Sequence, residues 1–259
     1  MHHITQLPKF IESYREYMQH GLISMDTFHA KIARIHAIQR TQRKMEERRA
    51  QRIKHDEMDA AIIAHRELMA EPLRTKPFIV LHGYAPGGKR GAKPVREVAI
   101  RTHIPGQPDI VQIIYFTGVH PAEDIERSIQ RVNESKQAGR DCMVMFVEEP
   151  YTTPSQAQKF VEKKLHEATK SILDATGVQP TLICYGFWQA PHIVSRGFRW
   201  PGEVYTIYRC TRAEFPGSPS IPQLIQLYNI PDAGHNGSIL HSVLSVEKIA
   251  LAQTAAYAP

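Results

Sequence analysis

The sequence predicts an α+β protein with two parts. A helical extension, residues 1–72, precedes a body, residues 73–259, in which a mixed, largely antiparallel β-sheet is flanked by helices. Three observations lead to this prediction. Residues 22–71 contain neither glycine nor proline, β-branched and aromatic residues cluster in short runs only after Pro77, and several later segments have apolar residues at helical spacing.

The extension begins with a helix over residues 8–20. Its apolar residues recur every three or four positions, and Gly21 follows as a stop signal. A second helix is expected to start near Ser24 or Asp26, since either side chain can cap it. Pro72 marks its end. The pattern fits either one long helix or a broken pair.

The middle of the second helix is strongly basic. Residues 40–54 contain seven cations and only two acidic residues, Glu46 and Glu47. A helix that is polar almost all round cannot bury a full face. Two interpretations stay open: a solvated helix with ion pairs such as Glu46 to Arg49, or a surface that binds nucleic acid or an acidic partner. The cations are Arg40, Arg43, Lys44, Arg48, Arg49, Arg52 and Lys54.

The body is expected to start with an antiparallel meander. Three strand-like runs are separated by segments rich in glycine and proline, which indicate turns. The later elements alternate between helical and strand patterns, and the run CMVMFVEE has the continuous apolar character of a buried strand. The predicted elements are strands at 78–84, 95–104 and 109–116, a helix at 121–139, a buried-type strand at 142–149, a helix at 154–177, strands at 181–188 and 203–210, and a helix at 238–256.

The turn at 85–94 is predicted to be a basic hairpin tip that projects from the meander. Seven cations and one acid, Glu97, occupy residues 74–101, a local net charge of +6 that equals the charge of the whole chain. Three glycines let its backbone approach a phosphate. A solvated loop is the other interpretation. A P-loop is excluded because no Ser or Thr follows the lysines, and an α/β-hydrolase is disfavoured because the chain has no GxSxG elbow.

No catalytic or metal site emerges from the pattern. The 14 histidines show no HExxH, HxH or cysteine–histidine grouping, and the three cysteines lie far apart. We therefore expect no metal and no cofactor, and the catalytic residues, if any, stay unknown.

Two short resemblances are present. From Cys142 to Cys210, the order strand, amphipathic helix, strand, short helix, Gly197-Phe198 and strand resembles the C-terminal half of GNAT acyltransferases. That resemblance implies coenzyme A at the start of the helix near 154, although TTPSQAQKF lacks the glycines of that family's pattern. Asp109 in QPDIVQI resembles the first half of the PD-(D/E)xK nuclease pattern, without its acid-x-Lys half.

The sequence thus predicts a non-enzymatic, or catalytically degenerate, binding or assembly protein. Its net charge of +6 and its pI near 9.2 suit contact with nucleic acid or an acidic protein surface. Alternatives are a GNAT-like acyltransferase and a structural subunit of a larger, oligomeric particle. We expect a cytoplasmic (intracellular) location without membrane contact, because no apolar run approaches the roughly 20 residues of a spanning helix and no signal-peptide pattern is present. The expected binding residues are Arg40, Arg43, Lys44, Arg48, Arg49, Arg52, Lys89, Arg90, Lys93 and Arg96.

Overall fold

A computed structural model of the chain confirms the α+β class. It divides into two compact units, Met1–Ala60 and Ala61–Pro259. The boundary lies inside the long second helix, because Ile62, Arg66 and Met69 on its last turns are buried in the second unit. The structure describes residues 7–84, 95–117, 120–136, 142–150, 153–186, 193–195, 197–211, 214–215, 219–230 and 238–257.

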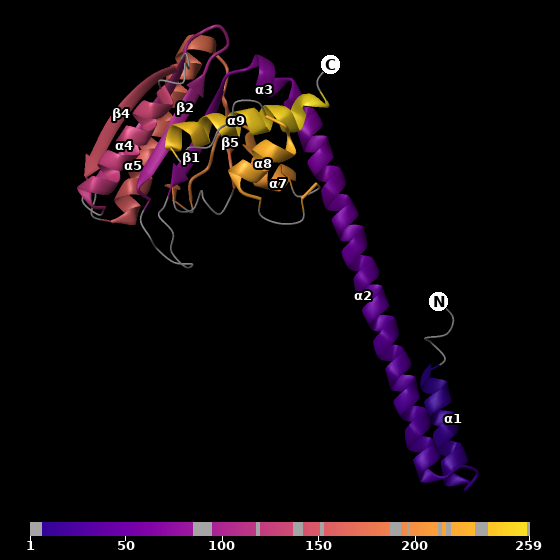
Figure 1. The fold of residues 1–259 in the computed structure, drawn as a ribbon. Helices are drawn as coiled ribbons and strands as arrows, with labels where there is room; N and C mark the ends of the chain where they lie inside the picture. The colour runs from indigo at the N-terminus through magenta and orange to yellow at the C-terminus, as the bar shows by residue number, and fades with distance from the viewer. Residues whose placement is uncertain are drawn as a thin grey trace. The chain divides into compact units, whose positions relative to one another are not determined.

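The first unit consists of α1 (Leu7–Gln19) and most of α2 (Met25–Ala70). Gly21 has a φ of +68°, which ends α1 as expected. Ser24 then caps α2 by accepting the Thr27 N–H at 3.2 Å. Figure 1 shows α1 beside the first half of α2, where the Lys31 ammonium lies 5.9 Å from the centre of the Tyr14 ring. The long helix is unbroken, which settles the choice that the sequence left open.

The second unit is built on a six-stranded sheet in the order β4-β3-β2-β1-β5-β6. The predicted meander β1–β2–β3 is confirmed as its antiparallel centre. The outer strands join in parallel: β4 on β3, β5 on β1, and β6 on β5. Every strand except β2 therefore points the same way. The strands are β1 (Phe78–Tyr84), β2 (Glu97–His103), β3 (Asp109–Thr117), β4 (Cys142–Pro150), β5 (Thr181–Cys184) and β6 (Val204–Thr206).

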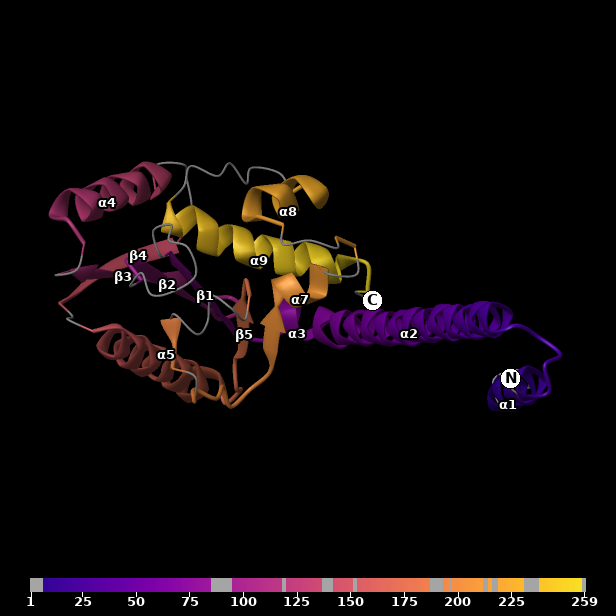
Figure 2. The ribbon, with the colours of Figure 1, turned by 90° about the horizontal axis from the view of Figure 1, so that it is seen from below.

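Helices cover both faces of this sheet. Figure 2 shows α4 (Ala122–Lys136) and α9 (Ile239–Ala255) on one side and α5 (Pro154–Thr176) on the other. On the α5 side, Val161, Leu165 and Ile172 pack in one buried cluster with the strand residues Ile100 and Ile114. Such burial is the main stabilising term of the unit.

The helix α5 has clear start and stop signals. Thr153 and Gln156 form a reciprocal capping box at its N-terminus, and Gly177, with a φ of +68°, ends it. These signals explain why this helix matches the predicted residues 154–177 closely.

The C-terminal helix α9 is buried almost all round and contacts β1, β2, β3 and β5. Its carboxylate Glu247 forms an ion pair with Arg101, whose guanidinium also pairs with Asp109 at the start of β3. The second Asp109 oxygen lies 2.7 Å from Nδ1 of His103, and the His103 ring stacks on Phe78 at 4.5 Å. This network ties α9 to the middle of the sheet. It also occupies both oxygens of Asp109, the residue that the nuclease pattern singled out.

The last turns of α2 are held by a second polar network. Three short helices lie near it: α3 (Pro72–Thr75), α7 (Ile207–Thr211) and α8 (Ile221–Leu227). Arg66 donates to Glu214 at 2.5 Å and to the carbonyl of Cys210. Burial opposes its charge, but the hydrogen bond and the charge of Glu214 outweigh it, so the pKa of Arg66 lies above its ordinary value. Gln253 of α9 completes the network by donating to Thr211 at 2.8 Å.

Three predicted strands differ from the structure. The run 181–188 is a strand only over Thr181–Cys184 among its described residues. The run 203–210 is a strand only over Val204–Thr206, because the chain then turns into α7, which packs on α9. The predicted buried-type strand at 142–149 is instead the edge strand β4, in which no side chain is buried. The predicted hairpin tip at 85–94 lies outside the described residues. In the described part of the chain, no helix is both long and apolar enough to cross a bilayer.

We predict that Arg101→Leu destabilises the protein by about 3–5 kcal/mol, because it leaves the buried Glu247 carboxylate and the half-buried Asp109 carboxylate without their guanidinium partner. Removing Glu247 as well, in Arg101→Leu/Glu247→Leu, should recover part of that loss. Urea denaturation of the variants measures both effects. As a control, Arg127→Leu breaks the exposed Arg127–Asp124 pair and should cost less than about 1 kcal/mol. Equal losses for the Arg101 and Arg127 variants would contradict the role given to Arg101.

Candidate functional site

The strongest candidate surface of the first unit is the stretch of α2 from residue 40 to residue 54, here called the basic segment. Each of its seven cations is exposed, and so are Glu46 and Glu47. At a rise of 1.5 Å per residue the segment is about 22 Å long. Between Gln39 and Glu57, no residue of α2 is buried. A stretch of helix without a buried face gains no stability from packing and is available to a partner.

The cations of the basic segment are not spread evenly around the helix. With about 100° between successive residues, six of them fall on one half of the circumference, which we call the basic face: Arg40, Arg43, Lys44, Arg48, Arg52 and Lys54. Arg49 lies on the other half, together with three exposed apolar side chains, Ile38, Met45 and Ile53. By the same geometry Glu47 also falls on the basic face, whereas Glu46 falls on the other half. The helix therefore presents one side with six cations and one carboxylate, and another side that is weakly apolar.

The cations of the basic segment have no ion-pair partner among the described residues. In the part that the structure describes, none of its cations takes part in an ion pair or a ring contact. Ion pairs between Glu46 or Glu47 and the arginines, one of the two interpretations of the sequence, are thus not formed. The only ion pair within described α2 residues 25–60 is His55–Asp59, at 3.3 Å.

A surface hollow lies beside the basic face and includes two of its arginines. It is lined by Ala33, His36, Gln39, Arg40 and Arg43, residues that share one side of α2. The His36 Nδ1 and Gln39 Oε1 atoms are 3.3 Å apart. The hollow thus combines hydrogen-bonding groups with the first two arginines of the face.

The remaining predicted binding residues do not join this surface. Lys89, Arg90 and Lys93 lie outside the described residues. Arg96 belongs to the second unit, where its guanidinium carbon lies 4.9 Å from the centre of the Tyr84 ring and its Nη2 donates to Glu97 at 3.2 Å. The charge of Arg96 is therefore already compensated by a carboxylate.

The structure also shows a buried polar cluster that the sequence reasoning missed. Glu97 is only 1% exposed, and it accepts hydrogen bonds from Arg96 and from Ser128 of α4. It lies opposite Tyr115 of β3, which is fully buried. Burial raises the pKa of Tyr115, and the negative charge of Glu97 raises it further. The sequence signal was present: Glu97, Ala99 and Arg101 alternate along one face of β2, so two charges had to share a covered face.

This cluster lies at the edge where the five parallel-pointing strands end. Ligands of α/β sheets often bind at such carboxyl ends. Nearby, His82 is buried and meets the Tyr185 ring edge-to-face at 6.4 Å. Burial raises the pKa of Tyr185 to about 12, and its hydroxyl donates to the carbonyl of Pro219. These tyrosines are neutral at physiological pH, and the Glu97 charge is paired with Arg96. The hydrogen bond from Ser128 to Glu97 links α4 to the sheet.

Neither metal binding nor thiol chemistry is supported by the described residues. Among them, no three His, Cys, Asp or Glu side chains are grouped to hold a metal ion. Cys184 and Cys210 are buried. Burial raises the pKa of the Cys184 thiol to about 11 and raises that of Cys210 as well. A thiol with a raised pKa is a poor nucleophile at neutral pH.

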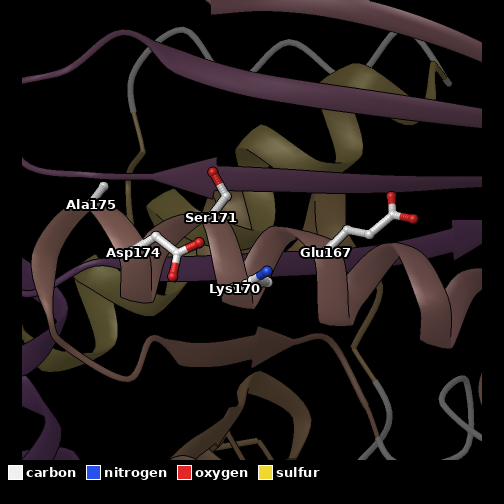
Figure 3. A pocket seen from close by; sticks show the side chains of 5 residues that line it. All are labelled: Glu167, Lys170, Ser171, Asp174 and Ala175. Carbon is white, nitrogen blue, oxygen red and sulfur yellow. The ribbon is translucent and has the colours of Figure 1, made fainter.

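Among the described residues of the second unit, an open hollow lies on the outer side of α5. Figure 3 shows its lining, Glu167, Lys170, Ser171, Asp174 and Ala175, all from this single helix. Glu167 is paired with Lys164 at 2.8 Å, which lowers the pKa of its carboxyl together with the charges of Lys164 and Lys163. A hollow with one wall does not enclose a substrate, so we assign it no function.

The segments that resemble an acyltransferase include β4, α5 and β5. The strand before α5 is β4 and the strand after it is β5, and these lie on opposite sides of the β1–β2–β3 meander. At the start of α5, the N–H of Gln156 is already bonded to Thr153 at 3.4 Å. Coenzyme A at this helix is what the acyltransferase resemblance alone implies, and the expected absence of a cofactor stays a prediction. Comparison of the chain with family models, with curated proteins and with solved structures found no significant match.

We predict that neither buried thiol reacts in the native protein. In a Cys142→Ser background, Ellman's reagent at about pH 8 should find almost no thiol, because only about one thousandth of a group with the raised pKa of Cys184 is thiolate there. Unfolding should release both thiols.

A matched control is Ser171→Cys in the same background. Ser171 is exposed on α5, so the new thiol should react at the rate of a free cysteine. If Cys184 or Cys210 reacted as fast as this control, its assignment as an inert core residue would be wrong.

Proposed function

We propose that the chain is a nucleic-acid-binding protein that contacts the phosphate backbone through the basic face of α2. The observation that carries the proposal is the set of six exposed cations on one half of a continuous helix, without any ion pair in the described part of the chain. An array of free cations on a rigid element neutralises several phosphates at once and releases their counterions.

The linear arrangement of the basic segment favours a regular polyanion. Five of its seven cations are arginines, whose planar guanidinium groups bind phosphate and carboxylate oxygens in a bidentate manner. The helix holds them along about 22 Å, and a DNA duplex carries one charge per about 1.7 Å of its axis. A regular polyanion suits this linear array better than the mixed charges of a protein surface.

The binding is expected to be independent of base sequence. Residues 39–64 contain no Phe, Tyr or Trp, so the segment has no side chain on which an unpaired base can stack. Backbone contacts fix position but carry no sequence information. Lys89, Arg90 and Lys93 stay a second part of this hypothesis on the grounds of sequence alone.

The proposal predicts that Arg40→Gln/Arg43→Gln/Arg48→Gln weakens binding to all duplex sequences alike. Glutamine has a similar helix propensity to arginine, so α2 should persist. Each lost phosphate contact should flatten the log–log dependence of the binding constant on salt by about 0.9, which amounts to roughly 2 to 3 for the triple variant. Fluorescence anisotropy titrations of a labelled duplex at several salt concentrations measure that slope.

A control with the same change in net charge is Lys159→Gln/Lys163→Gln/Lys170→Gln. These lysines are exposed on α5, and the slope of this variant should match that of the unchanged protein. Equal loss in both triple variants would show that net charge, not the basic face, governs binding. No binding at low salt would reject nucleic acid and leave an acidic protein as the partner of the same cations.

A further inference from the structure

The exposed edge strand β4 is a second candidate interaction surface, independent of the basic face. We propose that β4 pairs with β4 of a second copy of this chain in an antiparallel manner, so that two six-stranded sheets join into one across a two-fold axis. The proposal rests on the position, exposure and sequence of this strand.

Among the described residues, β4 pairs with another strand on one side only. Over Cys142–Pro150, all nine residues are aligned with β3. The sheet order ends at β4, and no other described strand lies on its outer side. A regular edge strand of this length offers a row of backbone N–H and C=O groups to another strand.

Side chains on both faces of β4 are exposed and apolar. Met143 and Met145 point to the α5 side of the sheet and are 59% and 44% exposed. Phe146, which is 39% exposed, lies on the opposite face. Ile110, the neighbour of Met143 on β3, extends the first patch. The strand that the sequence predicted to be buried therefore has apolar side chains in solvent on both faces.

The first six residues of β4 lack the protection that isolated edge strands carry, and its charges and Pro150 lie only at its C-terminal end. Lysine, proline and inward-pointing charges keep natural edges from pairing. Cys142–Val147 contains none of these, and the sequence CMVMFV has the continuous apolar pattern of a parallel strand that is covered on both faces. A partner strand would bring its own sheet and helices and would supply that cover.

A second copy fits this edge because two antiparallel copies of β4 place apolar residues opposite apolar residues and keep their charges apart. Its only charges, Glu148 and Glu149, lie at its C-terminal end. A parallel pair would place the four carboxylates side by side, whereas an antiparallel pair centred on Val144 or Met145 separates them and sets apolar residues opposite each other. The antiparallel pair is also the one that a two-fold axis produces. The opposite edge strand, β6, has only three residues, so the assembly ends at two chains.

The direct test is the mass of the full chain by analytical ultracentrifugation from about 1 to 100 µM, the range in which interfaces of modest size associate. The unchanged protein should form dimers, and Met145→Lys should raise the dissociation constant by at least about tenfold. Circular dichroism should show that the variant stays folded, because Met145 is already exposed. The matched control is Met45→Lys, which adds the same charge at a methionine of α2 that is 58% exposed and should leave the dimer intact.

Cross-linking locates the contact. In a Cys142→Ser background, Val144→Cys or Met145→Cys should form an intermolecular disulfide under mild oxidation, because one of them sits opposite its own copy at the two-fold axis. Gln130→Cys, exposed on α4, should not. A monomer at every concentration would overturn the proposal, and so would a dimer that survives Met145→Lys or loses its stability with Met45→Lys. If the protein is a monomer at every concentration but binds a synthetic CMVMFVEE peptide, the β4 edge pairs with a strand other than β4 of a second copy.

Discussion

The buried charge of Arg101 is the constraint on which the arrangement of the second unit depends. A guanidinium in the central strand of a sheet is costly unless carboxylates reach it. One carboxylate, Asp109, comes from the neighbouring strand, and the other, Glu247, comes from the C-terminal helix. The helix α9 must therefore lie over the middle of the sheet in one rotation, with Glu247 facing down. Its other contacts, with β1, β3, β5, α4, α7 and α8, follow from that position.

The direction of β2 has a second consequence. Because β2 alone runs against the other strands, the first residue of β2 lies among the last residues of its neighbours: Glu97 is aligned with Tyr84 of β1 and Tyr115 of β3. The face that holds Arg101 thus also holds Glu97, four residues earlier. Arg96 and Ser128 compensate this second charge. The same face of one strand carries a buried cation and a buried anion, each with partners from a different helix.

Two surfaces are left incomplete in a single chain, for different physical reasons. The basic segment of α2 carries seven cations against Glu46 and Glu47, and these cations form no ion pair among the described residues, which is why we propose a polyanion as its partner. The strand β4 has charges only at its C-terminal end, and apolar side chains on both of its faces are exposed, which is why we propose another strand as its partner. Under these proposals, long-range electrostatics would govern binding at the first surface, and salt would weaken it. Backbone hydrogen bonding and apolar burial would govern pairing at the second, which salt would affect little.

Local signals in the sequence determined most elements of this protein. Gly21, Ser24, Thr153 and Gly177 mark helix ends through backbone geometry that neighbouring residues decide, and the cations of α2 are exposed because no apolar stripe accompanies them. Only the tertiary structure decided which strand lies at an edge, that residues 207–211 leave the sheet for a helix, and which partners Glu97 and Arg101 receive. The physical reason is that pairing and burial depend on segments far apart in the chain: CMVMFV has the composition of a covered strand, but its cover depends on which neighbours the fold brings to it.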